Sequence, residues 1–193
     1  MNIETHEVDA NGLRTHYVAV GSGPPLLLLQ GDGESASCWQ WVLPALGRTH
    51  RVYAPDLPGS GRSDKPLPSY YAPLLSGSGE KTANSVASYT PEYYAGWLTG
   101  FLDALGLEQA VLVGHSFSGL VALRFALSAP ERVTDLVIVD SAGLGPEINP
   151  VLRLLTIPGI GEILPAFTLT PPGSMQRIWA RTALMFADPR RVP

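Results

Sequence analysis

The chain has 193 residues, of which 45% are hydrophobic and 16% are charged, so it can build a sizeable core and is not expected to be disordered. This length suits one domain with a small appendage. The formal net charge of -4 lacks the basic excess of a nucleic-acid-binding protein, and no nucleic-acid partner is expected.

The single cysteine, Cys38, excludes an internal disulfide and offers no metal cluster, and we expect it to be a small buried hydrophobic residue. The first residues lack the pattern of a signal peptide. No apolar run approaches the ~18 residues of a membrane span. The sequence therefore predicts a cytoplasmic protein with no membrane partner, no metal and no cofactor.

The N-terminal third contains four predicted elements. Residues 3–20 alternate around Asn11-Gly12, which is a strong signal for a β-hairpin. The continuous apolar run over residues 24–31 is typical of a strand buried on both faces. Residues 37–46 predict a short helix, and residues 50–56 predict the next strand.

The middle of the chain begins with an ordered turn that contains Pro58, and residues 68–88 then form a loop rich in Ser, Gly, Pro and Tyr. Thr90-Pro91-Glu92 predicts a helix start, with a capping hydroxyl, a proline in the first turn and an acidic residue. Apolar residues then recur at helical spacing, and Gly106 ends the helix.

Strand and helix patterns alternate in the next part of the chain. Residues 109–114 and 133–140 predict strands, and residues 118–130 predict the helix between them. This alternation predicts an α/β fold, with a mostly parallel sheet covered by helices on both faces. After Asp140 the pattern becomes helical, with interrupting prolines.

The join between the strand at 109–114 and the following helix carries the main chemical signal. Its residues are Gly114, His115, Ser116, Phe117, Ser118 and Gly119. Small residues on both sides of a serine allow a tight turn that presents the serine hydroxyl at the carboxyl end of the sheet and at a helix N-terminus. The next backbone N–H, that of Phe117, would then face a developing oxyanion. The hexapeptide predicts a nucleophile elbow, in which Ser118 replaces the usual second glycine and causes slight crowding; the alternative is an ordinary helix start with Ser116 as N-cap.

Together with residues 24–46 and 50–66, this region resembles the α/β-hydrolase family, over roughly residues 12–66 and 89–145. The stretch from Asp56 to Ser63 matches the family's Asp-x-x-Gly-x-Gly-x-Ser turn after the fourth strand, and we interpret Asp56 as a turn-forming residue. The resemblance implies an α/β-hydrolase core over residues 1–145, with strands 1 to 6. It also implies part of a helical cap over residues 146–193, so the chain looks truncated inside the cap region.

The resemblance also implies a second oxyanion donor on the loop after the third strand, which usually begins His-Gly. Here the loop reads Gln30-Gly31-Asp32-Gly33, so the matching donor is the N–H of Asp32. An acidic side chain opposes a developing negative charge unless it points away or is paired. The alternative is that Asp32 is a plain turn residue between two glycines.

A serine nucleophile needs a base, and the family order along the chain is serine, acid, histidine. No histidine follows Ser116. We expect each of the four histidines to be structural, namely His6, His16, His50 and His115. Asp140 is the single acid near the carboxyl end of a strand after Ser116, and some relatives place their acid there.

These observations predict a serine hydrolase that acts through Ser116 on small hydrophobic esters, lactones or related carbonyl substrates, and that is inactive as this chain alone. The serine excludes family members that use an aspartate nucleophile, such as dehalogenases and epoxide hydrolases. Two alternatives stay open: a non-catalytic binding protein, and one half of a two-chain hydrolase. The expected partners are a small carbonyl substrate and either a C-terminal complement or a second copy at the exposed strand over residues 133–140.

Overall fold

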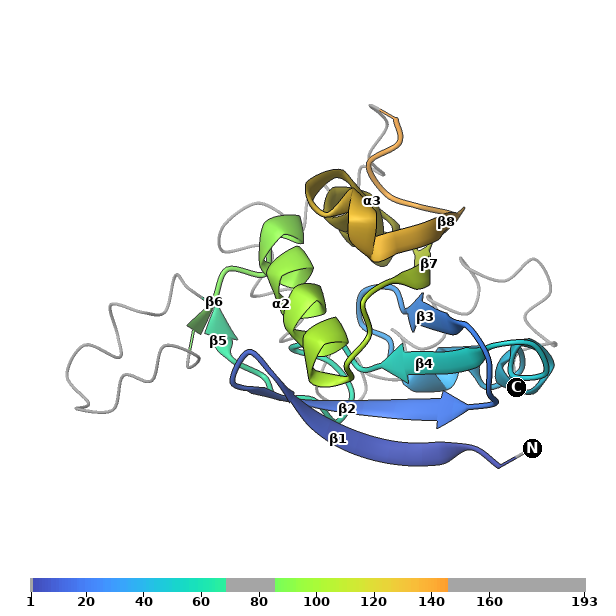
Figure 1. Cartoon of the computed structure of the whole chain (residues 1–193). Helices are drawn as coiled ribbons and strands as arrows, with labels where there is room; N and C mark the ends of the chain where they lie inside the picture. Colours follow the sequence, from blue (N-terminus) through green and yellow to red (C-terminus); the bar gives the residue numbers. More distant parts are fainter. Residues whose placement is uncertain (1, 69–85, 146–193) are drawn as a thin grey trace, which may run out of the picture. The chain divides into compact units, whose positions relative to one another are not determined.

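The computed structural model describes residues 2–68 and 86–145 (Figure 1). The predicted helical cap over residues 146–193 and most of the predicted loop over residues 68–88 lie outside this part. Among the described residues, no helix is long and apolar enough to cross a membrane.

A six-stranded sheet forms the centre of the described part (Figure 1). In spatial order its strands are β1 (Glu4–Ala10), β2 (Leu13–Val20), β4 (Arg51–Pro55), β3 (Pro25–Leu29), β7 (Ala110–His115) and β8 (Val133–Val139). The pairs β1–β2 and β2–β4 are antiparallel, and the remaining three pairs are parallel. The predicted mostly parallel sheet is therefore confirmed. Two-residue strands β5 (Leu67–Pro68) and β6 (Val86–Ala87) pair separately.

The predicted hairpin joins β1 to β2. Asn11 and Gly12 have φ angles of 56° and 79°, as the two central positions of a type I′ turn require. Asp9 Oδ1 accepts a hydrogen bond from the Gly12 N–H at 2.6 Å. Asn11 Nδ2 donates to the carbonyl oxygen of Gly96 at 3.0 Å, which ties the hairpin tip to α2.

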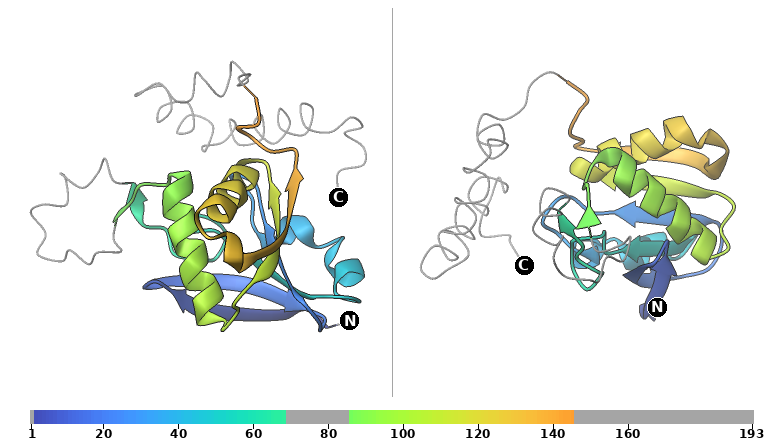
Figure 2. Two further views of the ribbon diagram at one scale, coloured as in Figure 1. Left: turned by 45° about the horizontal axis from the view of Figure 1, so that its top comes forward. Right: turned by 90° about the vertical axis from the view of Figure 1, so that its left-hand side faces the viewer.

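Helices cover both faces of the sheet (Figure 2). One face carries α2 (Pro91–Ala104) and α3 (Phe117–Ser128), which is followed by the short 3-10 helix η3 (Pro130–Arg132). The other face carries the 3-10 helix η1 (Ala36–Trp39) and the short helix α1 (Leu43–Leu46). The single helix predicted over residues 37–46 is thus wrong. Pro44 explains the break, since it has no N–H to bond the carbonyl of Gln40 and its ring would clash there.

Strand β3 shows why both faces need cover. Leu27 and Leu29 pack into the cluster under α2 and α3, whereas Leu26 and Leu28 pack into the cluster under η1 and α1. All four leucines are buried. The apolar run is therefore an interior strand, as predicted.

The start and end of α2 follow the sequence signals. The Thr90 side chain accepts a hydrogen bond from the Tyr93 N–H at 3.3 Å, and Pro91 occupies the first turn. Gly106, at φ 66°, follows the C-cap residue Leu105 and ends the helix.

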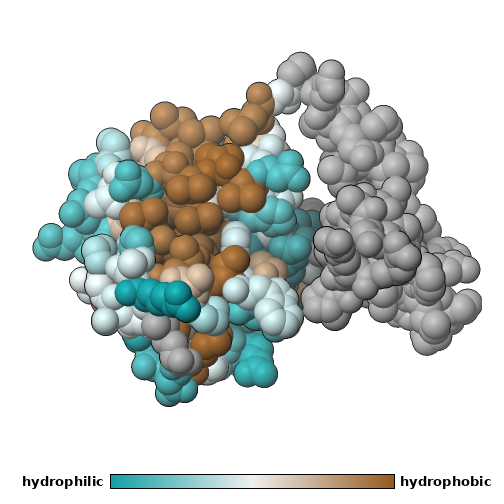
Figure 3. Space-filling view, turned by 90° about the vertical axis from the view of Figure 1, so that its right-hand side faces the viewer, coloured by the Kyte–Doolittle hydropathy of each residue, from teal (hydrophilic) through white to brown (hydrophobic). Residues whose placement is uncertain are grey.

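Strand β8 is the last strand of the sheet in the described part, because it pairs with β7 alone. None of its residues is buried, and Val137 and Val139 are 45% and 40% exposed. Val133, Leu136 and Ile138 are half-buried, and the residues between them face solvent. Figure 3 shows hydrophobic residues gathered in a band on one face of the molecule.

Candidate active site

The backbone at Ser116 has the strained geometry of a nucleophile elbow. β7 ends at His115 and α3 begins at Phe117, so Ser116 alone makes the turn, with φ 54° and ψ -122°. A non-glycine residue at positive φ costs of the order of 1–3 kcal/mol and persists only where the surroundings enforce it. The Ser116 side chain makes no capping hydrogen bond to α3. Ser116 thus occupies the N-cap position of α3, but without the side-chain bond or the extended backbone of an ordinary helix start.

Backbone hydrogen bonds hold the elbow in place. The Ser116 N–H donates to the Val139 carbonyl oxygen at 3.0 Å, and the Ser116 carbonyl oxygen accepts from the Ala142 N–H at 3.1 Å. Gly114 is required as well, because a Cβ there would penetrate the backbone of Ser118 and approach Gly119 Cα to 2.7 Å. The predicted need for small residues around the serine is thus a matter of direct backbone contact.

Ser118 ties the elbow to the neighbouring loop rather than crowding it. Its side chain is buried, and its Oγ donates to the Gln30 carbonyl oxygen at 2.5 Å. Gln30 is buried too, and when its side-chain amide is turned by 180°, so that it faces a matching donor and acceptor, it donates to Pro55 O at 2.7 Å and accepts from Leu57 N–H at 2.9 Å. Both departures from the family pattern therefore form structural hydrogen bonds between strands β3, β4 and the elbow.

The loop after β3 lies directly against Ser116. A Cβ on Gly31 would be 3.1 Å from Ser116 Cβ and 3.1 Å from His115 Nδ1. The Glu34 N–H donates to Gly31 O at 3.3 Å, and Gly33 has φ 69°, so residues 31–34 form a tight turn with Asp32 at its tip. Asp32 is exposed, which leaves its carboxylate solvated.

An aromatic group borders the elbow on the α2 side. The Tyr94 ring packs edge-on against Phe117 with centroids 5.4 Å apart, and the Tyr94 hydroxyl donates to Pro58 O at 3.1 Å. Burial, followed by the charges of Tyr89 and Asp32, raises the pKa of Tyr94. Tyr93 packs on Tyr94, and its buried hydroxyl has no hydrogen-bond partner within the described residues.

The His115 side chain contacts Glu34 and Trp39. Its Nδ1 lies 3.4 Å from Glu34 Oε2, and its ring packs edge-on against Trp39 at 6.2 Å. Cys38 lies beside this group and is exposed, which corrects the expectation that it is buried. Partial burial of its thiol, followed by the Glu34 charge, raises the pKa of Cys38 to about 12.

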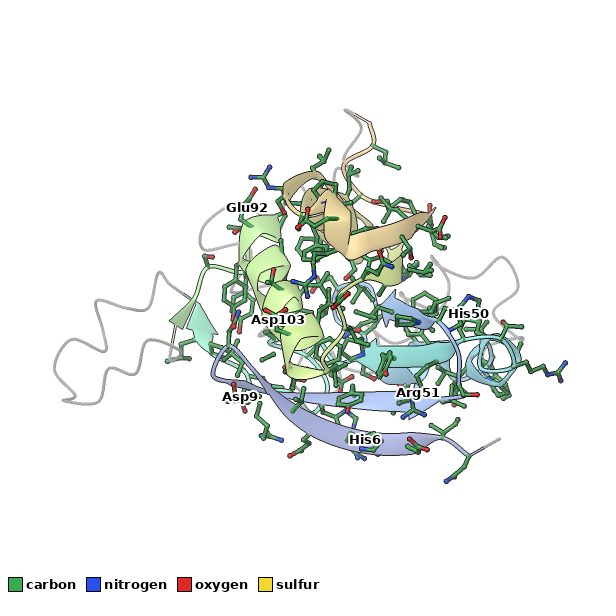
Figure 4. The ribbon with its side chains drawn as sticks, in the orientation of Figure 1. His6, Asp9, His50, Arg51, Glu92 and Asp103 are labelled. Carbon is green, nitrogen blue, oxygen red and sulfur yellow. The ribbon has the colours of Figure 1, made fainter. Side chains whose placement is uncertain are left out.

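The other three histidines have structural contacts. His16 Nδ1 donates to Asp56 Oδ2 at 2.9 Å in a buried pair, and Asp56 also accepts from the N–H groups of Ala36 and Arg62. Asp56 therefore organises the turn after β4, as interpreted from the sequence. His6 stacks on Tyr17 on the outer strand β1, and His50 bonds Thr49 at the start of β4 (Figure 4).

Asp140 follows β8 directly and is exposed, with φ 46°. Within the described residues no hydrogen bond or ion pair joins it to a histidine or to Ser116. The structure thus brings together Ser116, Phe117 and the loop that carries Asp32. It does not connect Asp140 to this group.

Comparison with known proteins agrees with this arrangement. A family model described as "alpha/beta hydrolase fold" matches residues 24–181. The chain is 38% identical to 2-hydroxymuconate semialdehyde hydrolase from a Pseudomonas species, over 72% of this chain and 44% of that protein. It is 36% identical to epoxide hydrolase 3 from Siraitia grosvenorii, over 70% of this chain and 38% of that protein.

Solved structures give the same result. A meta-cleavage product hydrolase from Pseudomonas fluorescens matches with a TM-score of 0.62 and 30% identity, over 77% of this chain and 49% of that one. The chain spans about half the length, or less, of these relatives. The matching family model and the elbow geometry show that the chain belongs to the α/β-hydrolase fold family.

Proposed function

We propose that Ser116 is the nucleophile of a hydrolase that acts on small hydrophobic esters, lactones or related carbonyl compounds. The observation that carries this proposal is the strained backbone at Ser116, with the Gly31 loop packed against its Cβ. Strain of this kind at a serine between a strand and a helix has a catalytic use, since it exposes the hydroxyl at the edge of the sheet.

In this mechanism Ser116 Oγ adds to the carbonyl carbon while a base takes its proton. The negative charge then develops on the carbonyl oxygen, which the N–H groups of Phe117 and Asp32 stabilise as hydrogen-bond donors. Within the described residues, neither N–H donates a hydrogen bond to another residue. The exposed position of Asp32 keeps its carboxylate in water, which screens its repulsion of the oxyanion.

The aromatic pair Tyr94 and Phe117 supports a hydrophobic substrate, because it places apolar surface next to the nucleophile. The names of two relatives, 2-hydroxymuconate semialdehyde hydrolase and meta-cleavage product hydrolase, support carbonyl substrates. Another relative is named an epoxide hydrolase. We favour the carbonyl substrates because the nucleophile here is a hydroxyl, whereas an aspartate nucleophile is the family's solution for epoxides.

The base is the missing element of the mechanism. All four histidines of the sequence lie at or before residue 115, and each has the structural contacts described above. In another serine hydrolase, loss of the base lowers kcat by about 10⁶. We therefore expect this 193-residue polypeptide by itself to show little or no sustained ester turnover.

Chemical rescue tests the nucleophile separately from the base. The chain is incubated with a chromogenic short-chain ester and free imidazole, and the covalent acyl-enzyme is counted by intact mass spectrometry. We expect one acyl group per chain, which Ser116→Ala abolishes. Ser128→Ala is the matched control, because Ser128 lies at the other end of α3 and bonds only Phe125 O, at 3.0 Å.

Two results would contradict the proposal. Acylation that persists in Ser116→Ala would place the reactive group elsewhere. Failure of the parent chain to acylate, combined with tight binding of the ester, would favour the alternative of a non-catalytic binding protein. Robust turnover without imidazole would instead show that a base is already present in the chain.

A further inference from the structure

We propose that Glu34 is a positioning residue that holds the oxyanion loop against the nucleophile elbow before substrate binds. The inference rests on the proposed function, because it concerns the loop that carries the Asp32 N–H. It assigns a role to a side chain that no sequence motif singled out.

Glu34 closes its own turn in two ways. Its backbone N–H donates to the Gly31 carbonyl oxygen at 3.3 Å, and its Oε2 accepts from the Gly31 N–H at 3.1 Å. Both polar groups of Gly31 are thereby bonded to one residue. Asp32 and Gly33, between them, are fixed as the tip of the turn.

The same carboxylate reaches the elbow. Glu34 Oε2 lies 3.4 Å from Nδ1 of His115, the residue directly before the nucleophile. A Cβ on Gly31 would be 3.2 Å from Glu34 Oε2 and 3.1 Å from Ser116 Cβ. Gly31 therefore lies between the Glu34 carboxylate and Ser116, and a side chain at this position would be in tighter than ordinary contact with both.

A second contact fixes the other end of the loop. Ser118 Oγ donates to the carbonyl oxygen of Gln30, the residue before Gly31. With Gln30 held by Ser118 and Gly31 held by Glu34, the donor at Asp32 is placed by its two preceding residues. A donor that is already in place needs no reorganisation when the oxyanion forms.

The chemistry of this contact explains why an acidic residue is tolerated beside the site. The Glu34 charge is used by the Gly31 N–H and faces the His115 ring, and its side chain is only 22% exposed. The required property is an oxygen acceptor at this position. We therefore expect Glu34→Gln to retain the role and Glu34→Ala to lose it.

The test measures hydrogen exchange of the Gly31 amide by NMR in the full chain, with the Leu28 amide of β3 as an internal reference. A hydrogen bond to a carboxylate predicts that Glu34→Ala raises the Gly31 exchange rate about 10- to 100-fold, with Leu28 unchanged. Glu34→Gln should stay within about threefold of the parent chain. Glu92→Ala is the matched control, because Glu92 lies on α2 in an exposed ion pair with Arg124 at 3.1 Å (Figure 4).

A second readout follows the imidazole-assisted acylation rate of Ser116 in the same variants, which should fall in Glu34→Ala and recover in Glu34→Gln. Unchanged Gly31 exchange in Glu34→Ala would overturn the proposal, as would equal acceleration in both variants or parallel acceleration of Leu28. If no variant acylates, including the parent chain, the proposed nucleophile fails. The exchange rates still decide the role of Glu34 in that case.

Discussion

The two neighbouring strands β7 and β8 are similar in sequence but very different in their surroundings. β7 lies between β3 and β8, and its inward residues Ala110, Leu112 and Gly114 are buried. β8 has the same kind of apolar run, yet none of its residues is buried. An apolar run therefore indicates that a strand is suited to the interior, whereas its burial depends on which other segments pair with it.

The largest loss of stability should come from truncating a buried side chain of β7, and the same kind of change on β8 should cost much less. Leu112→Ala removes a side chain that is 0% exposed, and we expect it to lower the free energy of unfolding by about 2–5 kcal/mol. Val137→Ala on β8 should cost less than about 1 kcal/mol, since this valine is already 45% exposed. Urea denaturation of both variants measures the difference. Equal losses would mean that β8 is covered in solution.

The stability of the interior part of the sheet also depends on the hydrogen bond between Ser118 and Gln30. Ser118→Ala leaves the Gln30 carbonyl oxygen without its donor in a buried position, and we expect a loss of about 1–3 kcal/mol. Ser128→Ala, which removes a hydroxyl from an exposed residue of the same helix, should cost less. The comparison uses thermal and urea unfolding. A neutral Ser118→Ala would show that the hydroxyl fills space without holding the loop.

Much of this contrast could be predicted from the sequence, and the rest could not for physical reasons. The Asn11-Gly12 turn, the Thr90 cap and the elbow at Ser116 are local signals, and all three are present. The contacts of Glu34 and Ser118 with the Gly31 loop join segments that are distant in sequence or depend on side-chain direction. No periodicity encodes such contacts. The predicted burial of Cys38 was wrong, because composition indicates how often a residue type is buried but not where it lies on a given helix.

The aromatic residues beside the elbow should make the stability of the chain depend on alkaline pH. Burial, followed by the charge of Tyr89, raises the pKa of Tyr93 from 10.0 to about 12. Between these two values the Tyr93 hydroxyl keeps its proton in the folded chain and loses it in the unfolded chain. The contribution of Tyr93 to the free energy of unfolding is therefore fully present below pH 10.0 and is lost as the pH rises toward about 12.

Tyr93→Phe tests this effect by urea denaturation at neutral and alkaline pH. The variant should flatten the alkaline loss of stability, although Tyr89 and Tyr94 will keep part of it because burial raises their pKa values too. At neutral pH the change should be within about 1 kcal/mol, since the hydroxyl has no partner in the described part. An alkaline slope that is identical in both proteins would show that Tyr93 is solvated.

A substitution on β8 should change self-association strongly and the free energy of unfolding very little. We propose that the outer edge of β8 pairs with a second copy or with a complementary C-terminal segment, so the purified chain should run larger than a monomer and bind a hydrophobic dye. Val137→Lys should disrupt this association while changing stability by only about 0.5 kcal/mol. Analytical ultracentrifugation measures the effect. A monodisperse, dye-silent parent chain would refute the proposed pairing.

The backbone bonds between β8 and the elbow have a dynamic consequence. Ser116 donates to the carbonyl of Val139 at the end of β8 and accepts from the N–H of Ala142 just after this strand, so the elbow is anchored at a strand that has no buried residue. Strand ends with few buried contacts open more often than the interior of a sheet. We therefore expect fluctuations at the end of β8 to reach Ser116 through its hydrogen bond to Val139. A chain that pairs with the outer edge of β8, as proposed above, would damp those fluctuations and narrow the range of positions that Ser116 samples.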